Sequence, residues 1–346
     1  MPTEAPARRL DPRPQRALRL AFGTAACLAT SFGLALPIPF LPPVLTLFLL
    51  AMRNQPLSLK ASLGLAVLAA VTTGGGLLLI PLLRYYPASG VLLVALCLFL
   101  CFGYALRGGN NLVSTFLIIG LTLVSATGAS AFAIALTVIE ALVKGLLLTS
   151  LCVALGHWLF PEPSGLAEPP VRPPPDPRQT AWIALRATLV VIPAFLLALI
   201  DPGSYVPLVM KAVSLGQQVC VTSARDTGRE LLGSTLLGGL LAVCFWSALS
   251  LFPHLWMFFL WTLLFVLLLA RRLYRLTDNR QTPGFWLNGA ATLIILLGQS
   301  VQDSAAGKDV YTAFAVRMGL FIAVTLYACA AVRLIDRRRL RPLPAA

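Results

Sequence analysis

Four ionisable residues fall inside apolar stretches of this sequence, and they are its strongest candidates for chemistry. Glu140 and Lys144 lie together in "TVIEALVKGLLL", residues 137–148, while Lys211 and Arg317 lie in two later stretches. A charge in a helix that crosses a membrane costs about 2.5–3.5 kcal/mol, so we expect these residues to face the bundle interior or a water-filled cavity. Three cations and one acid favour an anion, with Lys144, Lys211 and Arg317 binding it and Glu140 carrying a proton.

Glu140 and Lys144 also admit a simpler interpretation. They stand at i and i+4 with the acid on the N-terminal side, which is the favourable order for an ion pair within one helix. Mutual neutralisation would let the charged face insert without any role in transport, and the sequence leaves both interpretations open. Asp201, Asp303 and Asp309 lie near the expected outer ends of their helices, where solvated loop acids are expected.

The segments that must position these residues are membrane helices. The 346 residues are 58% hydrophobic and only 12% charged, with a mean hydropathy of +0.84, more apolar surface than a soluble chain of this length buries. The apolar runs predict an all-α polytopic membrane protein with twelve spans. These spans are 17–36, 40–53, 61–83, 88–106, 111–128, 131–159, 180–200, 205–221, 229–251, 254–273, 283–300 and 309–335.

The basic residues predict the orientation of these spans. All but five of the 27 Lys and Arg residues fall on one side, and the exceptions are Arg84 and Lys308 outside and the three intramembrane cations. This is the positive-inside pattern, so both termini are expected in the cytoplasm. The first span, with its Arg-rich lead, is typical of an uncleaved signal anchor. The net charge of +14 then reflects topology and anionic lipid headgroups, not binding of nucleic acid.

The chain divides into two similar halves. A Pro-rich segment, 161–179, predicts a cytoplasmic linker between membrane repeats at 17–160 and 180–335, with basic tails at 1–16 and 336–346. "ALRLAFGTAACLATSFGLALP" at 17–37 resembles "ALRATLVVIPAFLLALIDP" at 184–202, and the order of Pro, Arg and loop positions also matches. Six spans in each half predict two parallel repeats. Arg317 then falls within about a turn of the repeat position of Glu140 and Lys144.

Two spans at matching repeat positions point to a substrate site. The second and eighth spans are short and are entered through "LPIPFLPP" and "IDPGSYVP". Short or Pro-interrupted spans at the repeat interface commonly form transporter sites, and a helix that begins at membrane depth suits an anion. Tight external turns explain the same prolines equally well. The small-residue patches "TTGGG" and "GSTLLGG" in the third and ninth spans are expected to permit close helix packing.

Several other functions lack support in the sequence. The seven cysteines all fall in predicted spans without a CxxC pair, and His157 and His254 have no second ligand at metal-binding spacing. The sequence contains no phosphate-binding loop, HExxH motif or nucleophile elbow. We therefore expect no metal, no cofactor, no ATP hydrolysis and no enzymatic activity.

The stretch "YYPASGVLLVALCLFLCFGYALRGGNNLVSTFLIIGLTLV", residues 85–124, resembles the fusaric acid resistance superfamily, which includes bacterial aromatic carboxylic acid exporters. The Pro-initiated span, the turn "ALRGGNN" and the following "FLIIGLT" carry the resemblance. It implies an inner-membrane efflux component for aromatic or other organic acids, working with a periplasmic adaptor of the membrane-fusion type. Many members carry large cytoplasmic domains, so this chain resembles a compact branch, and no binding residue transfers from the family.

The leading interpretation is a secondary exporter of organic anions, coupled to proton entry through Glu140. A channel-like anion permease needs the cations but no essential acid. A non-transporting membrane subunit uses the intramembrane charges for helix pairing instead. The expected partners are the organic anion, membrane lipids and the adaptor, with a homo-oligomer left open and the identity of the substrate beyond reach.

Overall fold

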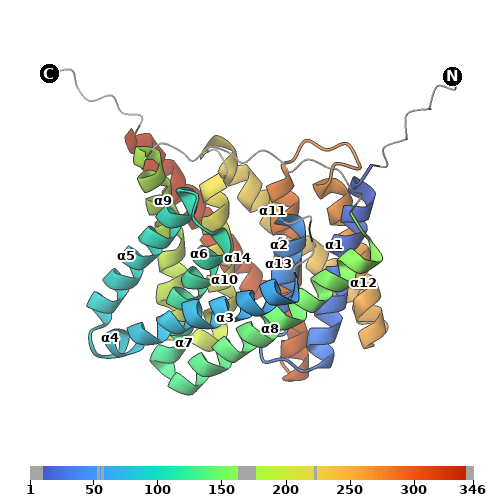
Figure 1. The fold of residues 1–346 in the computed structure, drawn as a ribbon, viewed down its shortest axis with the longest axis horizontal. Coiled ribbons are helices and arrows are strands. Elements are labelled where there is room, and N and C mark those ends of the chain that lie inside the picture. The colour runs from blue at the N-terminus through green and yellow to red at the C-terminus, as the bar shows by residue number, and fades with distance from the viewer. Residues whose placement is uncertain (1–10, 53–54, 56–57, 163–176, 222–223, 340–346) are drawn as a thin grey trace.

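The computed structural model describes residues 11–52, 55, 58–162, 177–221 and 224–339 as one helical bundle, without a strand among them (Figure 1). Twelve helical segments make up this described part, and each coincides with one predicted span. Most of the predicted linker and the outer parts of both predicted tails lie outside the described residues. The described chain ends emerge on the same side of the bundle.

The first half of the chain supplies six of the segments. Two of them are continuous helices with an irregular turn in the middle, one of 3-10 type (η1) and one of π type (η2). In order, the segments are α1 (Arg13–Gly33), α2 (Leu41–Met52), α3 (Leu59–Gly74) with η1 (Gly75–Leu79) and α4 (Ile80–Tyr85), α5 (Pro87–Leu106), α6 (Asn111–Ile119) with η2 (Gly120–Val124) and α7 (Ser125–Ser130), and α8 (Phe132–Leu159).

The second half supplies six uninterrupted helices. They are α9 (Pro177–Ile200), α10 (Pro202–Val221), α11 (Ala224–Leu249), α12 (Leu255–Leu273), α13 (Pro283–Ala305) and α14 (Val310–Arg339). The eighth span was predicted to be short, but α10 begins three residues earlier and runs for 20 residues. Helix α13 likewise continues to residue 305, five residues beyond its predicted end.

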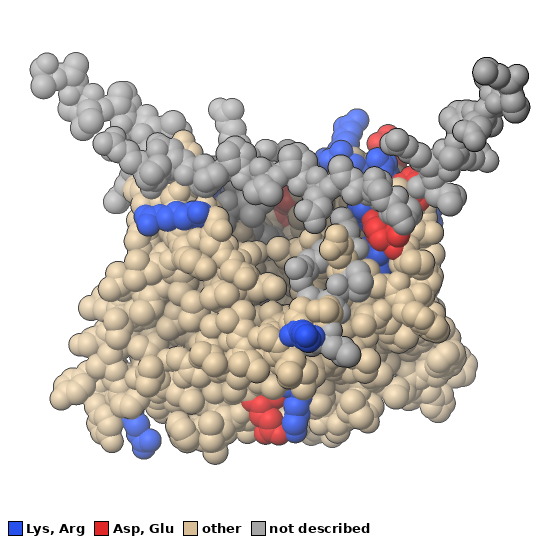
Figure 2. All heavy atoms as spheres, in the orientation of Figure 1, with Lys and Arg blue, Asp and Glu red and all other residues tan. Residues whose placement is uncertain are grey.

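Nine of the described segments are long and apolar enough to cross a membrane, so the protein is embedded in a membrane through many helices. In lipid, a helix satisfies its backbone hydrogen-bonding groups internally, which makes it the stable form of such apolar runs. The 12 residues of α2 extend only about 18 Å and do not span a hydrocarbon core. Figure 2 shows basic side chains gathered along the edge where the chain ends emerge, above a broad band with few charges.

The turn "ALRGGNN" between α5 and α6 has a clear local cause. Gly108, just after α5, adopts a φ of +89°, a left-handed conformation that glycine reaches without a steric penalty. The side chain of Asn110 then accepts a hydrogen bond of 3.0 Å from the backbone N–H of Leu112 and caps α6. The turn therefore reverses the chain between two long helices within a few residues.

Helices from the two halves pack against each other in a reciprocal way. Helix α1 lies along α12, and α9 lies along α5, so the first helix of each half contacts the fourth segment of the other. The second segment of each half also contacts the fifth segment of the other, since α2 packs on α13 and α10 packs on α6, η2 and α7. Helix α13 is almost wholly buried at the centre of this arrangement.

The predicted close packing of the small-residue patches is confirmed. A Cβ added to Gly76 would lie 2.0 Å from the carbonyl oxygen of Gly120, so η1 and η2 cross with their backbones in contact. In the second half, a Cβ on Gly238 would lie 2.6 Å from the carbonyl oxygen of Gly289. Both crossings join the third and fifth segments of their half, and larger side chains would force them apart.

Candidate functional site

Glu140 and Lys144 lie on the surface of α8 and form a salt bridge with each other. Each side chain is 55% exposed, so the expectation that the pair faces the bundle interior was wrong. Helix α8 is about 42 Å long, more than a hydrocarbon core requires, and it crosses the bundle on a slant (Figure 1). The i, i+4 spacing lets the two charges neutralise each other on this outer face.

Arg317 on α14 also has a carboxylate partner. Its Nη2 lies 2.9 Å from Oδ1 of Asp303 on α13, and its Nη1 contacts Oδ2, giving a two-pronged ion pair. Asp303 was expected to be a solvated loop acid, and this was wrong because α13 continues past it and buries the carboxylate. Asp303 and Arg317 therefore neutralise each other between two packed helices.

Lys211 lies near the middle of α10 and is 1% exposed. Its Nζ donates hydrogen bonds of 2.9 Å to Oδ1 of Asn288 and 2.6 Å to Oγ1 of Thr292, which stand one turn apart on α13. The Asn288 amide in turn donates a hydrogen bond of 2.6 Å to Oγ of Ser234 on α11. Within the described part of the chain, Lys211 has no carboxylate within ion-pairing distance, so its acceptors are neutral oxygens.

The four predicted site residues therefore do not form one cluster. Among the described contacts, only Glu140 and Lys144 bind each other, and none joins them to Lys211 or Arg317. Asn288, Thr292 and Ser234 were missed from the sequence. An Asn and a Thr four residues apart inside an otherwise apolar span were the available signal, because they mark a polar stripe on one helix face.

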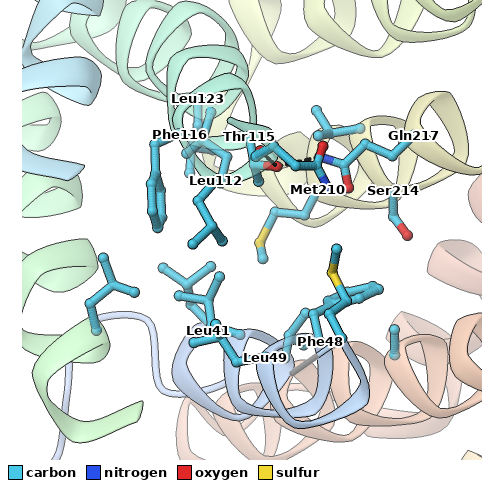
Figure 3. Close-up of a pocket in the computed structure, with 18 of the residues that line it drawn as sticks. Leu41, Phe48, Leu49, Leu112, Thr115, Phe116, Leu123, Met210, Ser214 and Gln217 are labelled. Carbon is cyan, nitrogen blue, oxygen red and sulfur yellow. Dashed lines mark hydrogen bonds between the residues drawn. The ribbon is translucent and has the colours of Figure 1, made fainter. Parts of the chain in front are cut away.

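A cavity of about 340 Å³ lies between the two halves (Figure 3). Its wall comes from α2, α3, α6, η2 and α8 of the first half and from α10 and α13 of the second. The lining side chains are Leu41, Val44, Leu45, Phe48, Leu49, Met52, Leu65, Asn110, Asn111, Leu112, Thr115, Phe116, Ile119, Thr122, Leu123, Leu146, Val209, Met210, Val213, Ser214, Gln217, Ala291 and Ile295. No charged residue is among the described residues of this lining, which is apolar for most of its area.

Polar groups gather toward one end of the cavity. Gln217 on α10 donates a hydrogen bond of 2.9 Å to Oγ1 of Thr115 on α6, linking the two halves across the lining (Figure 3). The hydroxyl of Ser214, one turn from Gln217, is buried and has no hydrogen-bond partner in the described structure. Asn110 and Asn111 line the same end, where α6 begins close to the side of the chain ends.

Both spans singled out from the sequence, now α2 and α10, contribute to this lining. Their N-terminal ends, however, are poor anion sites. Pro42 and Pro43 remove two N–H donors from the first turn of α2, and the N–H of Leu41 is bonded to the carbonyl of Ile38. The carboxylate of Asp201 stands before α10 and accepts from the N–H of Ser204, so an acid already occupies that end.

Lys211 lies directly behind the cavity wall. It follows the lining residue Met210 on α10, and its two acceptors on α13 flank the lining residue Ala291. Lys211 is the one Lys or Arg on these two helices, and its described acceptors are neutral oxygens. Because a low-dielectric interior screens charge poorly, a protonated Lys211 would extend its positive potential into the cavity.

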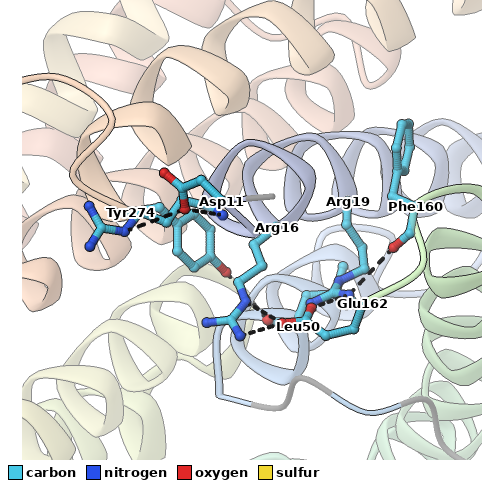
Figure 4. Close-up of polar contacts among 8 residues, drawn as sticks. Asp11, Arg16, Arg19, Leu50, Phe160, Glu162 and Tyr274 are labelled. Atoms are coloured by element: carbon cyan, nitrogen blue, oxygen red, sulfur yellow. Dashed lines mark hydrogen bonds and ion pairs between the residues drawn. The ribbon is translucent and has the colours of Figure 1, made fainter. Parts of the chain in front are cut away.

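A second polar group lies on the side where the chain ends emerge (Figure 4). Arg16 and Arg19 of α1 both form salt bridges with Glu162, which follows α8, and Arg19 is 1% exposed. The hydroxyl of Tyr274, after α12, lies 3.5 Å from the carbonyl oxygen of Leu50, and burial raises the pKa of Tyr274 to about 12 despite the nearby arginines. We call Arg16, Arg19 and Glu162 the clasp, because they join α1 to the end of α8.

These features define a polytopic α-helical membrane protein with an apolar compartment between its halves. The profile of a membrane-protein family described as "Protein of unknown function (DUF2955)" matches residues 16–156. No curated protein and no solved structure matches the chain. The family match assigns no function, and the resemblance to the fusaric acid resistance superfamily stays a hypothesis.

Proposed function

We propose that the protein is a secondary transporter of organic anions and that the cavity between its halves is the substrate compartment. The observation that carries this proposal is the combination of an apolar cavity with Lys211 behind its wall, a buried cation without a described acidic partner. The resemblance adds that the anions are aromatic carboxylates, that the direction is export across a bacterial inner membrane, and that a periplasmic adaptor takes part.

The reciprocal packing supports two parallel six-helix repeats. If the halves are related by a two-fold axis, each contact between them should occur twice. The contact of α1 with α12 and the contact of α9 with α5 form such an equivalent pair. The two glycine crossings also occupy equivalent segments. In such folds the substrate site lies at the repeat interface near the bilayer midplane, and this cavity is lined from both halves of the chain, by α2 and α10 among others.

The lining suits a compound with an apolar body and a polar end. Leu, Val and Phe side chains offer contact to rings or alkyl groups, while Ser214 and Gln217 offer hydrogen bonds at one end. About 340 Å³ is at the lower end of the range of small-molecule pockets, which fits one aromatic acid. Since Glu140 pairs with Lys144 and Asp303 with Arg317, Lys211 is the one of the three predicted anion-binding cations without a described carboxylate partner.

The test uses purified protein in liposomes and 2-naphthoate as the probe. Met210→Trp fills the cavity, whereas Leu151→Trp adds the same ring to the exposed face of α8. We expect Met210→Trp to lower probe transport at least tenfold, while Leu151→Trp keeps the wild-type rate and both variants keep the wild-type thermal stability. Equal transport by the two variants would exclude the cavity as the substrate compartment.

A further inference from the structure

We infer that Lys211 binds a proton and the organic anion together, so that the two cross the membrane in the same direction. The inference rests on the proposed transport function and specifies its coupling. It differs from the exchange with an entering proton at Glu140 that the sequence suggested. It begins from the hydrogen bonds around Nζ, because they determine which protonation states of the amine the site accepts.

Both groups that touch Nζ are obligatory acceptors. The hydroxyl of Thr292 donates to the carbonyl of Asn288 at 2.7 Å, so its oxygen can only accept from Lys211. The hydroxyl of Ser234 donates to the carbonyl of Leu231 at 3.1 Å, so it accepts from the amide nitrogen of Asn288. That contact turns the amide oxygen of Asn288 toward Lys211.

Two acceptors use two N–H groups, and the amine has two in its neutral form and three when charged. The third proton has no partner among the described residues, so it leaves or returns without breaking a hydrogen bond. In that step one N–H bond breaks, its electron pair stays on Nζ, and the proton passes to water that enters from the cavity. The site thus accommodates both protonation states equally well in hydrogen-bonding terms.

Among the residues that the structure describes, no other group is bonded to the amine of Lys211. The ionisable side chains described on α10 and on the helices packed against it are Arg186, Tyr205, Glu230, Cys244, Asp303, Tyr311, Arg317, Tyr327, Cys329 and Arg333. None is bonded to Lys211; Asp303 is held by Arg317, and Glu230 accepts a hydrogen bond from Thr282. A carboxylate brought by the substrate is therefore the missing counter-charge.

Coupling follows from the cost of a lone buried charge. With the cavity empty, an unpaired ammonium in the bundle is unfavourable, so the neutral amine is the form that crosses without substrate. With an anion present, the ammonium–carboxylate pair is the favoured form. One proton therefore accompanies each monovalent anion, and the loaded step moves no net charge.

The first experiment observes the amine itself. The chain has four lysines, at 60, 144, 211 and 308, so selective 13Cε labelling gives few NMR signals, assigned by Lys→Arg variants. Between about pH 5.5 and 9, where an exposed lysine stays charged, we expect the Lys211 signal to titrate and 2-naphthoate to shift it toward the protonated form. The inference is overturned if the Lys211 signal does not change with pH, or does not shift on addition of 2-naphthoate, even if transport is intact.

The second experiment measures coupling in liposomes loaded with 2-naphthoate. We expect efflux to rise about tenfold when the internal pH falls by one unit, and to change less than about twofold when a K⁺ gradient with valinomycin sets the potential. Efflux driven by potential and indifferent to pH indicates a uniport and overturns the inference. Efflux raised by external acid indicates exchange and overturns it too. Absence of wild-type efflux refutes the proposed function instead.

Two variants separate the role of Lys211 from general stability. Asn288→Asp places a permanent carboxylate beside Nζ, so we expect a folded protein whose Lys211 stays protonated and whose efflux falls at least tenfold. Lys211→Gln is expected to lose the pH dependence of any remaining efflux. Lys144→Gln, a matched change on the surface of α8, is expected to keep it. Wild-type pH dependence in Asn288→Asp or Lys211→Gln contradicts the inference.

Discussion

The intramembrane charges of this protein are compensated in three different ways. Lys144 is neutralised one turn away on its own helix, and Arg317 is neutralised by Asp303 on a neighbouring helix. The acceptors described for Lys211 are neutral oxygens. Because an uncompensated charge is the expensive case in lipid, the first two arrangements suit insertion and packing, while the third suits a site that awaits a ligand.

The Asp303–Arg317 pair predicts a stability effect at the scale of single residues. Asp303→Asn leaves the guanidinium, which is 18% exposed, without its carboxylate, and breaking a buried pair from one side costs about 3–5 kcal/mol. Thermal unfolding in detergent is expected to show a clear loss for Asp303→Asn and recovery of most of it in Asp303→Asn/Arg317→Gln. Glu140→Gln, which breaks the exposed ion pair on α8, is the reference variant and is expected to lower the stability less. If the stability losses of Asp303→Asn and Arg317→Gln simply added up in the double variant, the two residues would not be coupled.

At the scale of elements, irregular turns occur where two helices of the first half touch. The 3-10 turn η1 and the π turn η2 contact each other at Gly76 and Gly120, and each interrupts an otherwise regular helix. A π turn widens the helix locally and changes which side chains face the same way before and after it. Thr122 and Leu123, inside η2, are thereby directed to the cavity.

Because the two backbones touch at this crossing, one added methyl group is predicted to lower the stability of the protein. In Gly76→Ala the new Cβ would meet the Gly120 carbonyl oxygen at 2.0 Å, and such overpacking costs about 1–3 kcal/mol. Gly64→Ala is the matched control, since nothing lies within 4 Å of its Cβ position, and alanine favours the helix there. The unfolding midpoint is expected to fall only for Gly76→Ala; a fall in both variants would point to a general loss of glycine flexibility.

At the scale of the whole molecule, the described chain ends and many of the described basic residues lie on one side of the bundle. The clasp, the turn at Arg107 and the described chain ends lie at that edge. The opposite edge carries the short connection at 306–309 between α13 and α14, with Lys308 among its few charges. This distribution gives the bundle one strongly basic end, as positive-inside orientation requires.

The orientation is open to a direct test in a bacterial host. A fluorescent protein fused after residue 346 is expected to be fluorescent, since it folds in the cytoplasm, and alkaline phosphatase inserted at Gly307 is expected to be active, since it needs the oxidising periplasm. Phosphatase inserted at Gly108, on the other edge, is the control and should be inactive. The opposite pattern of activities would invert the topology.

The sequence predicted the segments well because apolar run length reports directly on spanning helices, and all twelve segments begin within a few residues of their predicted starts. It predicted poorly which way the charges face. Helical spacing alone was compatible with Glu140 facing the interior or forming an ion pair on the outside. In the structure, the slanted helix α8 carries the pair on its outer face. Asp303 was misplaced because its partner Arg317 belongs to the next helix, and such pairing depends on packing that no single run specifies.

The clasp also bears on how the chain is made. Arg16 and Arg19 belong to α1, which is synthesised before Glu162 at the end of α8, and α12, the long packing partner of α1, follows later still. Helix α1 is thus made before both of these partners, and its packing against α12 can form only after the second half has been synthesised. The clasp needs only residues 16–162, so its salt bridges can form before the second half that covers α1 has been made.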